Sequence, residues 1–294
     1  MAATPPASPP SPVDVTSADA RGPAAVDEDP AGLYLPDGDG FLPTIASRGP
    51  WSPDAQHGGP VAALLVREAE RVESVVPLAV MRLTLELLRP APLRRLTVRS
   101  RLRRPGKRVQ LIELALLDGE VEVALATVLR VRVADVPLEG AVPLPGTAPD
   151  GAAPPAPPTA DMPLLQDGRF PWLDTLGMEV RFATGSFAEP GPSTAWFRLR
   201  MPVVAGEEPS PAQRAVVAAD SGSGVGAALD FATWSFLNPE LTVHLARQPE
   251  GEWVAVEAGT LLSRSGTGVA TTRLWDRSGV VGQASAALLV EPGR

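Results

Sequence analysis

Two stretches of the chain resemble each other, and this internal repeat limits the fold more than any other feature. Arg82–Arg89 reads RLTLELLR, and Glu240–Arg247 reads ELTVHLAR 158 positions later. Each stretch is followed by a second β-rich run and then by a hairpin turn, at Asp118-Gly119 in one half and at Asp276–Gly279 in the other. A shared order with a nearly constant offset indicates a duplicated unit.

Each unit is expected to hold one buried helix followed by long antiparallel strands. Val61–Val66 is apolar nearly all round and precedes the charged run Arg67–Arg71, which predicts a helix that is buried in its first turns. Ser52 and Ser210 each precede a proline, as a helix N-cap residue often does. Leu83–Leu87 alternates apolar and polar residues, which is typical of a half-buried strand. The fold class is therefore α+β, with a sheet wrapped around a helix in each unit.

Composition divides the chain into four parts. Residues 1–30 are rich in Pro, Ala, Ser and Asp and are expected to form a disordered tail. Residues 136–169 hold a second proline-rich run, which we interpret as a linker. The two repeated units are then 31–135 and 170–291.

Charge and composition exclude several classes of function. The net charge is −8, which disfavours nucleic acid as a partner. The chain has no cysteine and two histidines, so neither a thiolate nor a histidine-rich metal site is expected. No signal peptide and no apolar run of membrane-spanning length is visible. We expect a soluble cytoplasmic protein without a metal.

The motifs of both halves resemble one protein family. WSPDAQHGGPVAALLVREAER, RLTLELLRPAPL and RPGKRVQLIELALLDG are similar to the first half of type II acyl-CoA thioesterase-like proteins. SPAQRAVVAADSGSGVG, SFLNPELTVHLAR and GEWVAVEAGTLLSRSGTGVA are similar to the second half. The resemblance covers roughly residues 31–135 and 170–291. It implies the double hotdog fold, two tandem units that each wrap an antiparallel sheet around one central helix.

The resemblance also implies a function in fatty acid metabolism. Family members hydrolyse an acyl-CoA thioester to a free acid and coenzyme A with an activated water, without a covalent intermediate and without a cofactor. Hotdog units pair through sheet edges, so a homo-oligomer is expected. One alternative is an acyl-CoA or acyl-carrier binding protein with impaired catalysis, and another is a structural role. The sequence does not define the acyl chain.

Two of the family's three catalytic positions have counterparts in this sequence, and they give three candidate residues. The family's helix aspartate falls on Asp220, which stands in an otherwise apolar run, so burial is expected to raise its pKa and suit it to activate water. The family's Ser or Thr falls near Asn238, with Thr242 as a substitute. Asn238 also fits a turn before Pro239. Asp220, Asn238 and Thr242 are the candidate catalytic residues.

The family's glutamine has no clear counterpart. Its position falls on Ala286, and Gln283 is three residues earlier, which places it on the opposite face of a strand. Ala286 therefore favours the binding-protein alternative.

The first half offers a candidate substrate-binding segment, His57-Gly58-Gly59. Glycines at a helix start let backbone N–H groups approach a thioester carbonyl or a phosphate, although close packing also requires small residues. Hotdog hydratases need a paired His and Asp in one short motif, and Asp54 is the nearest carboxylate to His57 in sequence. A hydratase is therefore disfavoured.

A basic run lies between Arg94 and Arg108, with no acidic residue in it. Arginine forks suit the phosphates of coenzyme A, and a solvated outer sheet face is the other interpretation.

Overall fold

A computed structural model describes residues 30–50, 52–137, 139–140 and 173–293. Residues 1–29 of the predicted tail and residues 138 and 141–169 of the predicted linker lie outside the described residues. Among the helices in the described ranges, none has the length and apolar character needed to cross a membrane.

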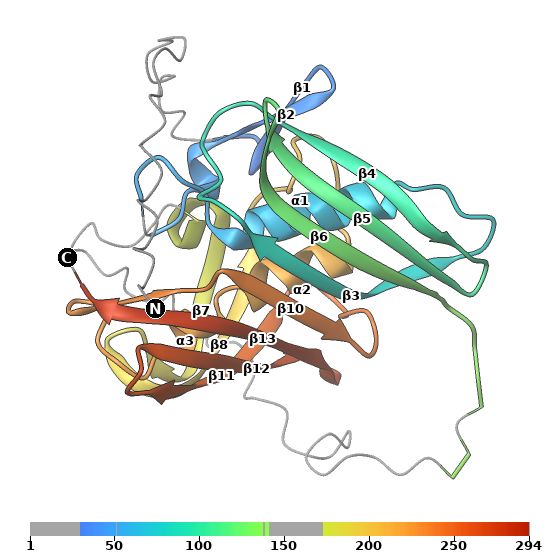
Figure 1. Ribbon diagram of the computed structural model, residues 1–294. Coiled ribbons are helices and arrows are strands. Elements are labelled where there is room, and N and C mark those ends of the chain that lie inside the picture. The colour runs from blue at the N-terminus through green and yellow to red at the C-terminus, as the bar shows by residue number, and fades with distance from the viewer. Residues whose placement is uncertain (1–29, 51, 138, 141–172, 294) are drawn as a thin grey trace, which may run out of the picture.

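In the first half, strands surround a single long helix (Figure 1). The strands are β1 (Tyr34–Asp37), β2 (Gly40–Pro43), β3 (Leu78–Leu87), β4 (Leu96–Pro105), β5 (Val109–Asp118) and β6 (Val121–Arg132). Helix α1 covers Gly58–Glu70, and a short 3-10 turn at Ile45–Ser47 precedes it.

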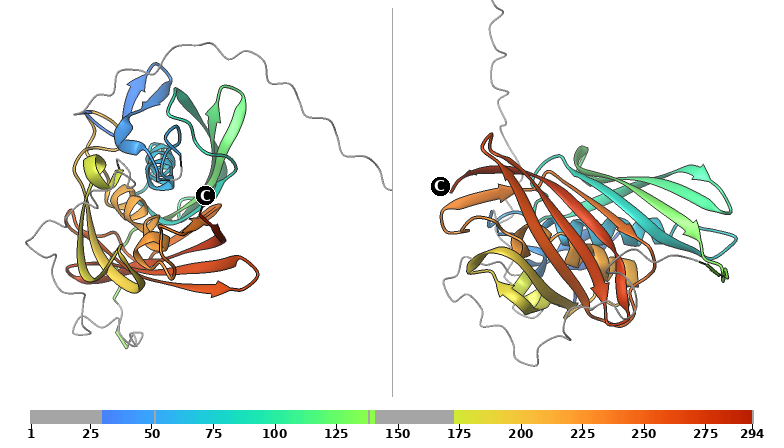
Figure 2. Two further views of the ribbon diagram at one scale, coloured as in Figure 1. Left: turned by 90° about the vertical axis from the view of Figure 1, so that its left-hand side faces the viewer. Right: turned by 90° about the horizontal axis from the view of Figure 1, so that it is seen from below.

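The second half repeats this plan with a shorter helix (Figure 2). Its strands are β7 (Met178–Ser186), β8 (Glu189–Leu199), β9 (Trp234–Leu237), β10 (Glu240–Leu245), β11 (Val254–Ser263), β12 (Thr267–Asp276) and β13 (Gly279–Pro292). Helix α2 covers Pro211–Ala219, α3 covers Gly222–Val225, and a π-helical turn covers Leu173–Gly177.

The described strands form one antiparallel sheet that runs through both halves. Its order is β1-β2-β4-β5-β6-β3-β10-β13-β12-β11-β8-β7, and β9 also pairs with β13. The halves join where β3 pairs with β10, so the two repeated sequence stretches lie side by side. Thr84 and Thr242, which are 158 positions apart, face each other there. The repeat is therefore related by an approximate two-fold axis between these residues.

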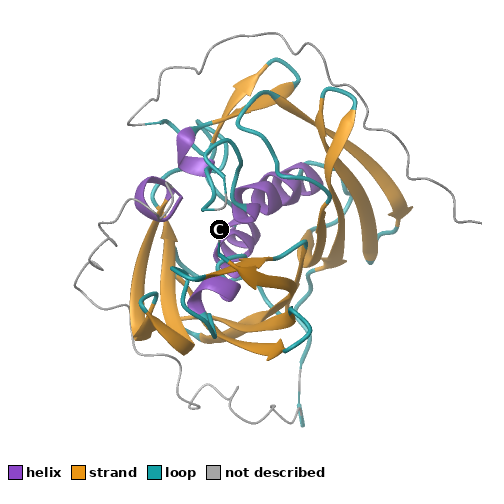
Figure 3. Ribbon diagram, turned by 60° about the vertical axis from the view of Figure 1, so that its left-hand side comes forward, coloured by secondary structure: helices purple, strands orange, loops and turns teal. Residues whose placement is uncertain are grey.

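Helices α1 and α2 lie side by side inside the curved sheet (Figure 3). Val61–Val66 is buried throughout, and so are Ala215–Ala219 of α2. Their side chains form one core with the inward-facing residues of both halves of the sheet. The predicted α+β architecture is confirmed, and the burial of these apolar helices accounts for it.

One predicted helix start is wrong. Ser210 caps α2 by accepting a hydrogen bond from the Gln213 N–H at 3.1 Å, with Pro211 as the first helical residue, as expected. Helix α1 is capped by His57, however, and Ser52 lies six residues before the helix. The offset of 158 between the strands therefore does not extend to the helices, because the segment between helix and strand differs in length between the halves.

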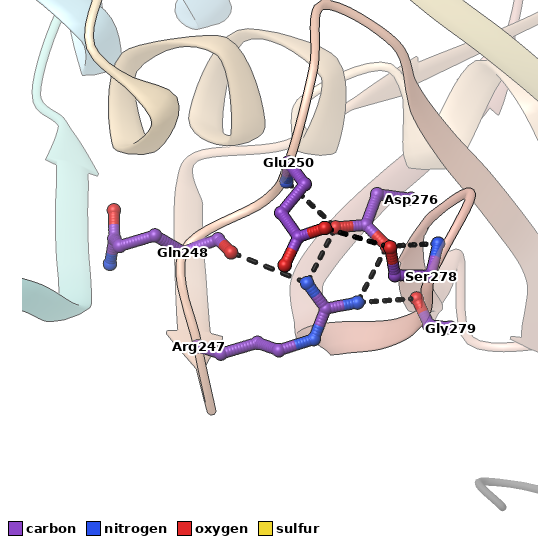
Figure 4. Close-up of polar contacts among 6 residues, drawn as sticks. All are labelled: Arg247, Gln248, Glu250, Asp276, Ser278 and Gly279. Carbon is purple, nitrogen blue, oxygen red and sulfur yellow. Dashed lines mark hydrogen bonds and ion pairs between the residues drawn. The ribbon is translucent and has the colours of Figure 1, made fainter. Parts of the chain in front are cut away.

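A polar cluster at the end of β10 fixes the loops at one end of the second half (Figure 4). The fully buried carboxylate of Asp276 binds both terminal nitrogens of Arg247 at 2.5 Å. It also accepts the backbone N–H groups of Glu250 at 2.7 Å and Ser278 at 2.8 Å. Burial alone would raise the pKa of Asp276, but these donors lower it.

Candidate active site

The start of α1 meets the end of α2, and this contact joins the two halves where a histidine meets a buried carboxylate. His57 is the N-cap of α1, and Asp220 follows the last residue of α2. His57 Nδ1 lies 2.8 Å from Asp220 Oδ2, and the two side chains are 13% and 3% exposed. The sequence suggests no carboxylate partner for His57 beyond Asp54. That assignment is wrong, because the partner comes from the other half of the chain.

Two glycines allow this approach. A Cβ atom at Gly58 would lie 2.8 Å from Asp220 Oδ2 and 3.0 Å from Oδ1. A Cβ atom at Gly59 would lie 2.9 Å from the backbone oxygen of Val217, so any side chain there would push the helices apart. The glycines after His57 are therefore needed both for helix packing and for the position of the Asp220 carboxylate.

Two groups approach His57 Nδ1. The N–H of Gly59 lies 3.1 Å from it and also donates to the Asp220 carboxylate. A ring nitrogen 2.8 Å from an ionised carboxylate must carry the proton between them. We therefore assign the ring proton to Nδ1, where it is donated to Asp220.

The pKa of Asp220 is lowered in spite of its burial. Burial raises this pKa, but the positive charge that His57 carries when protonated and hydrogen bonds from His57, Asn238 and Gly59 outweigh the effect. The predicted burial of Asp220 is confirmed, and the predicted direction of its pKa shift is wrong. The prediction took account of burial and not of these donors.

Asn238 reaches the same carboxylate from a corner in the sheet. Its Nδ2 donates to Asp220 Oδ1 at 2.9 Å. Asn238 and Pro239 stand between β9 and β10, which both pair with β13. The chain leaves the β13 ladder at this corner, and the Asn238 side chain turns toward the helix end. Asn238 and Asp220, both predicted as catalytic, are thus brought together.

Thr242 does not join this cluster. Leu241 and Val243 of β10 are buried, whereas Thr242 and His244 point to the outer face of the sheet. The Thr242 hydroxyl donates to Glu240 Oε2 at 3.3 Å.

Ala286 and Gln283 lie on opposite faces of β13. Ala286 is buried on the inner face beside Ala270 of β12, and Gln283 is exposed. No amide side chain therefore stands at the position where the resemblance requires one. Ser221, directly after Asp220, has a buried hydroxyl without a hydrogen-bond partner in the described part of the chain. Such a group is a candidate for a contact with a bound molecule or water, and sequence reasoning missed it.

Gln56 holds the segment before α1. Its Oε1 accepts the Tyr34 hydroxyl at 2.5 Å, and its Nε2 donates to the Pro92 oxygen at 2.8 Å. The N–H of His57 donates to the Ser47 oxygen at 2.9 Å. These contacts fix the His57 backbone before the helix begins. The sequence offered no signal for them, since they join distant segments.

The opposite end of the helix pair has a different polar group. Glu70 of α1 accepts the Ser210 hydroxyl and the Gln213 side-chain amide, both at 2.8 Å. Burial raises the pKa of Glu70, and these two donors and Arg130 lower it only in part. The two ends of the helix pair therefore carry carboxylates with opposite pKa shifts, Asp220 buried and Glu70 partly buried, and only the Asp220 end contains a histidine.

Half of the eight basic side chains of the basic run are paired with carboxylates within the protein. Four of its arginines lie within ion-pair distance of carboxylates, namely Arg94 with Asp118, Arg95 with Asp37 and Asp39, Arg99 with Glu122, and Arg103 with Glu113. These exposed pairs favour the interpretation of the run as a solvated sheet face. Over the ranges that the structure covers, no three His, Asp or Glu residues gather as a metal site would require.

Two family models match the chain. Residues 47–131 match the acyl-CoA thioesterase N-terminal domain, and residues 148–290 match the acyl-CoA thioesterase C-terminal domain. No curated protein matches it.

Solved structures with the hotdog fold are similar to the chain. A conserved protein of unknown function from Alicyclobacillus acidocaldarius is 18% identical with a TM-score of 0.62, over 89% of this chain and 96% of that one. A proposed thioesterase II from Thermobifida fusca is 20% identical with a TM-score of 0.62, over 90% and 96%. An acyl-CoA thioesterase II from Mycobacterium marinum is 13% identical with a TM-score of 0.59, over 81% and 90%.

Proposed function

Because the chain belongs to the acyl-CoA thioesterase family of double hotdog proteins, we propose that it hydrolyses an acyl-CoA thioester to a free acid and coenzyme A. The observation that carries the proposal is the buried Asp220, which receives hydrogen bonds from His57, Gly59 and Asn238 where the two halves meet. Packing of the two helix ends alone would not require a histidine, a carboxylate and an amide at their junction.

In the proposed reaction Asp220 activates water together with His57. A carboxylate with a lowered pKa is a weak base, so Asp220 remains ionised and orients the imidazole through Nδ1. The reactive form has a neutral imidazole with its proton on Nδ1, so the proton of the attacking water passes to Nε2 as the oxygen bonds to the thioester carbon. Asn238 holds the second oxygen of Asp220. The carbon–sulfur bond then breaks, and the leaving thiolate takes the proton from His57.

The start of α1 binds the carbonyl oxygen in this proposal. The first N–H groups of a helix lack partners within the helix, and the helix dipole favours negative charge there. The N–H of Gly59 is engaged by the Asp220 carboxylate, so we assign the contact with the developing oxyanion to the N–H of Gly58. Substrate binding thus falls on His57, Gly58 and Gly59.

One observation favours a second candidate function. The inner face of β13 carries Ala286, and its neighbour on β12 is Ala270, so this part of the site supplies no side-chain donor. A protein that binds acyl-CoA or an acyl carrier without rapid hydrolysis is therefore the alternative.

Hydrolysis of acyl-CoA thioesters of graded chain length, followed by release of free thiol, tests the proposal. Wild-type protein should turn over at least one chain length, and Asp220→Asn should lower kcat by about 100- to 10,000-fold. The matched control is Glu70→Gln, which neutralises the partly buried carboxylate at the other end of the same helix pair and should retain turnover. Saturable binding without turnover in the wild type would favour the binding protein, and equal losses in both variants would contradict the assignment of the site.

The wider setting of the reaction is also proposed. We place the protein in the cytoplasm, in fatty acid metabolism, as a homo-oligomer. Light scattering of the purified chain tests the oligomeric state, and cell fractionation tests the location.

A further inference from the structure

The corner that carries Asn238 interrupts the backbone ladder of β13. Strand β10 pairs with β13 up to Ser285, and β9 resumes pairing at Leu289. The three residues between them have no strand partner on that side. Pro239, which stands opposite this gap, has no N–H to contribute.

A side chain fills this gap. Glu240 Oε1 accepts the N–H of Ala287 at 2.6 Å, so a carboxylate replaces the missing backbone acceptor. Glu240 Oε2 accepts the Thr242 hydroxyl at 3.3 Å, which orients the carboxylate along the strand. On the other side of the corner, the Pro239 oxygen accepts the N–H of Leu87 at 2.8 Å. The corner is therefore tied to both neighbouring strands.

The position of Glu240 is unfavourable for a carboxylate by ordinary sheet rules. Its cross-strand neighbour on β3 is Glu86, and like charges directly opposite each other destabilise a sheet. Glu86 is exposed, whereas Glu240 is partly buried and has two donors. The hydrogen bond from the Ala287 N–H therefore explains why a carboxylate is kept at position 240, and it gives no such reason for the carboxylate of Glu86.

We propose that Glu240 is a positioning residue that holds the Asn238-Pro239 corner so that the Asn238 amide reaches Asp220. Thr242, which the sequence suggests as a substitute catalytic residue, acts through Glu240 and touches no reacting atom. The inference rests on the proposed function for its effect on catalysis. Its structural part, the link between Glu240 and the Asn238 contact, does not.

The test compares Glu240→Ala, Glu240→Gln and the matched control Glu86→Ala. Glu240→Ala removes the acceptor and should lower kcat about 10- to 100-fold with KM changed less than about twofold, because a small displacement of a catalytic group has effects of this size. Glu240→Gln keeps an acceptor oxygen and should recover most of the lost rate. Glu86→Ala should have no effect on kcat.

A measurement without substrate separates this inference from the proposed function. Hydrogen exchange by NMR should show the Ala287 N–H protected in the wild type, and Glu240→Ala should expose it and also speed exchange of the Asn238 side-chain amide. If the wild type hydrolyses no thioester, these exchange rates still test whether Glu240 holds the Asn238 side chain in place. An Ala287 N–H that exchanges freely in the wild type would overturn the inference, even if Glu240→Ala does not fold. Equal effects from Glu86→Ala, or an Asn238 amide unchanged in folded Glu240→Ala, would also overturn it.

Discussion

Replacing Gly58 by alanine would place a methyl group against the Asp220 carboxylate. The added Cβ atom would lie 2.8 Å from Oδ2 and 3.0 Å from Oδ1. Ordinary contact needs roughly 3.5 Å, so the carboxylate would have to withdraw by about 0.5 to 0.7 Å. The same oxygens lie 2.8 Å from His57 Nδ1 and 2.9 Å from Asn238 Nδ2, and withdrawal would lengthen both contacts beyond good hydrogen-bond distance.

The expected result is a loss of catalysis together with a loss of stability of at most about 3 kcal/mol. A misplacement of this size costs up to about 100-fold in rate, so kcat should fall about 10- to 100-fold. Lost hydrogen bonds to Asp220 would destabilise the fold by about 1–3 kcal/mol, and the greater helix propensity of alanine would offset up to about 1 kcal/mol. Thiol release measures kcat, and urea unfolding measures the free energy of unfolding.

Gly224→Ala is the matched control for this substitution. Gly224 also lies in a helix, and an added Cβ atom would be 3.7 Å from the nearest ring atoms of Phe187 and Phe231, which is an ordinary contact. Its kcat should equal that of the wild type. Wild-type kcat in folded Gly58→Ala would refute the reasoning, because the carboxylate would then tolerate displacement.

Three further predictions concern stability. Asp276→Asn should lower the free energy of unfolding by about 2–4 kcal/mol in urea, because it leaves Arg247 without its buried partner, while kcat/KM per folded molecule stays unchanged. The pKa of Asp276 is lowered in the folded protein, so its contribution to the free energy of unfolding is present above the unfolded pKa of about 3.9 and is lost as the pH falls through the folded pKa. The Tm difference between wild type and Asp276→Asn should therefore shrink below about pH 4. A Tm difference that grows there would contradict this prediction. Gly222→Ala should lower Tm, since the new Cβ atom would lie 2.2 Å from Thr272 Oγ1, and adding Thr272→Ala should restore most of the loss.

The sequence was sufficient to predict the architecture because the two halves share the same alternation of apolar and polar residues in their strands. Leu83–Leu87 and its repeat alternate with period two, and such alternation depends only on which residues face the core. The buried position of Asp220 follows in the same way from its apolar neighbours. The start of α1 could not be predicted in this way, because the distance in sequence from the helix to the following repeated strand differs between the two halves.

The His57–Asp220 contact could not be predicted from local patterns. The two residues are 163 positions apart, and their meeting depends on how α1 and α2 pack. The signal that could have suggested it was the pair of glycines after His57, which permits the close approach of a second helix. The direction of the Asp220 pKa shift likewise depends on donors that only the fold brings together.

The measurement that tests the central claim most directly is a double-mutant cycle of His57 and Asp220 in thioester hydrolysis. If the two side chains act as one unit across the halves, His57→Gln and Asp220→Asn should each lower kcat/KM strongly, and the double variant should lose little more than the more impaired single variant. Losses that multiply in the double variant would show that the residues act independently and would contradict the account.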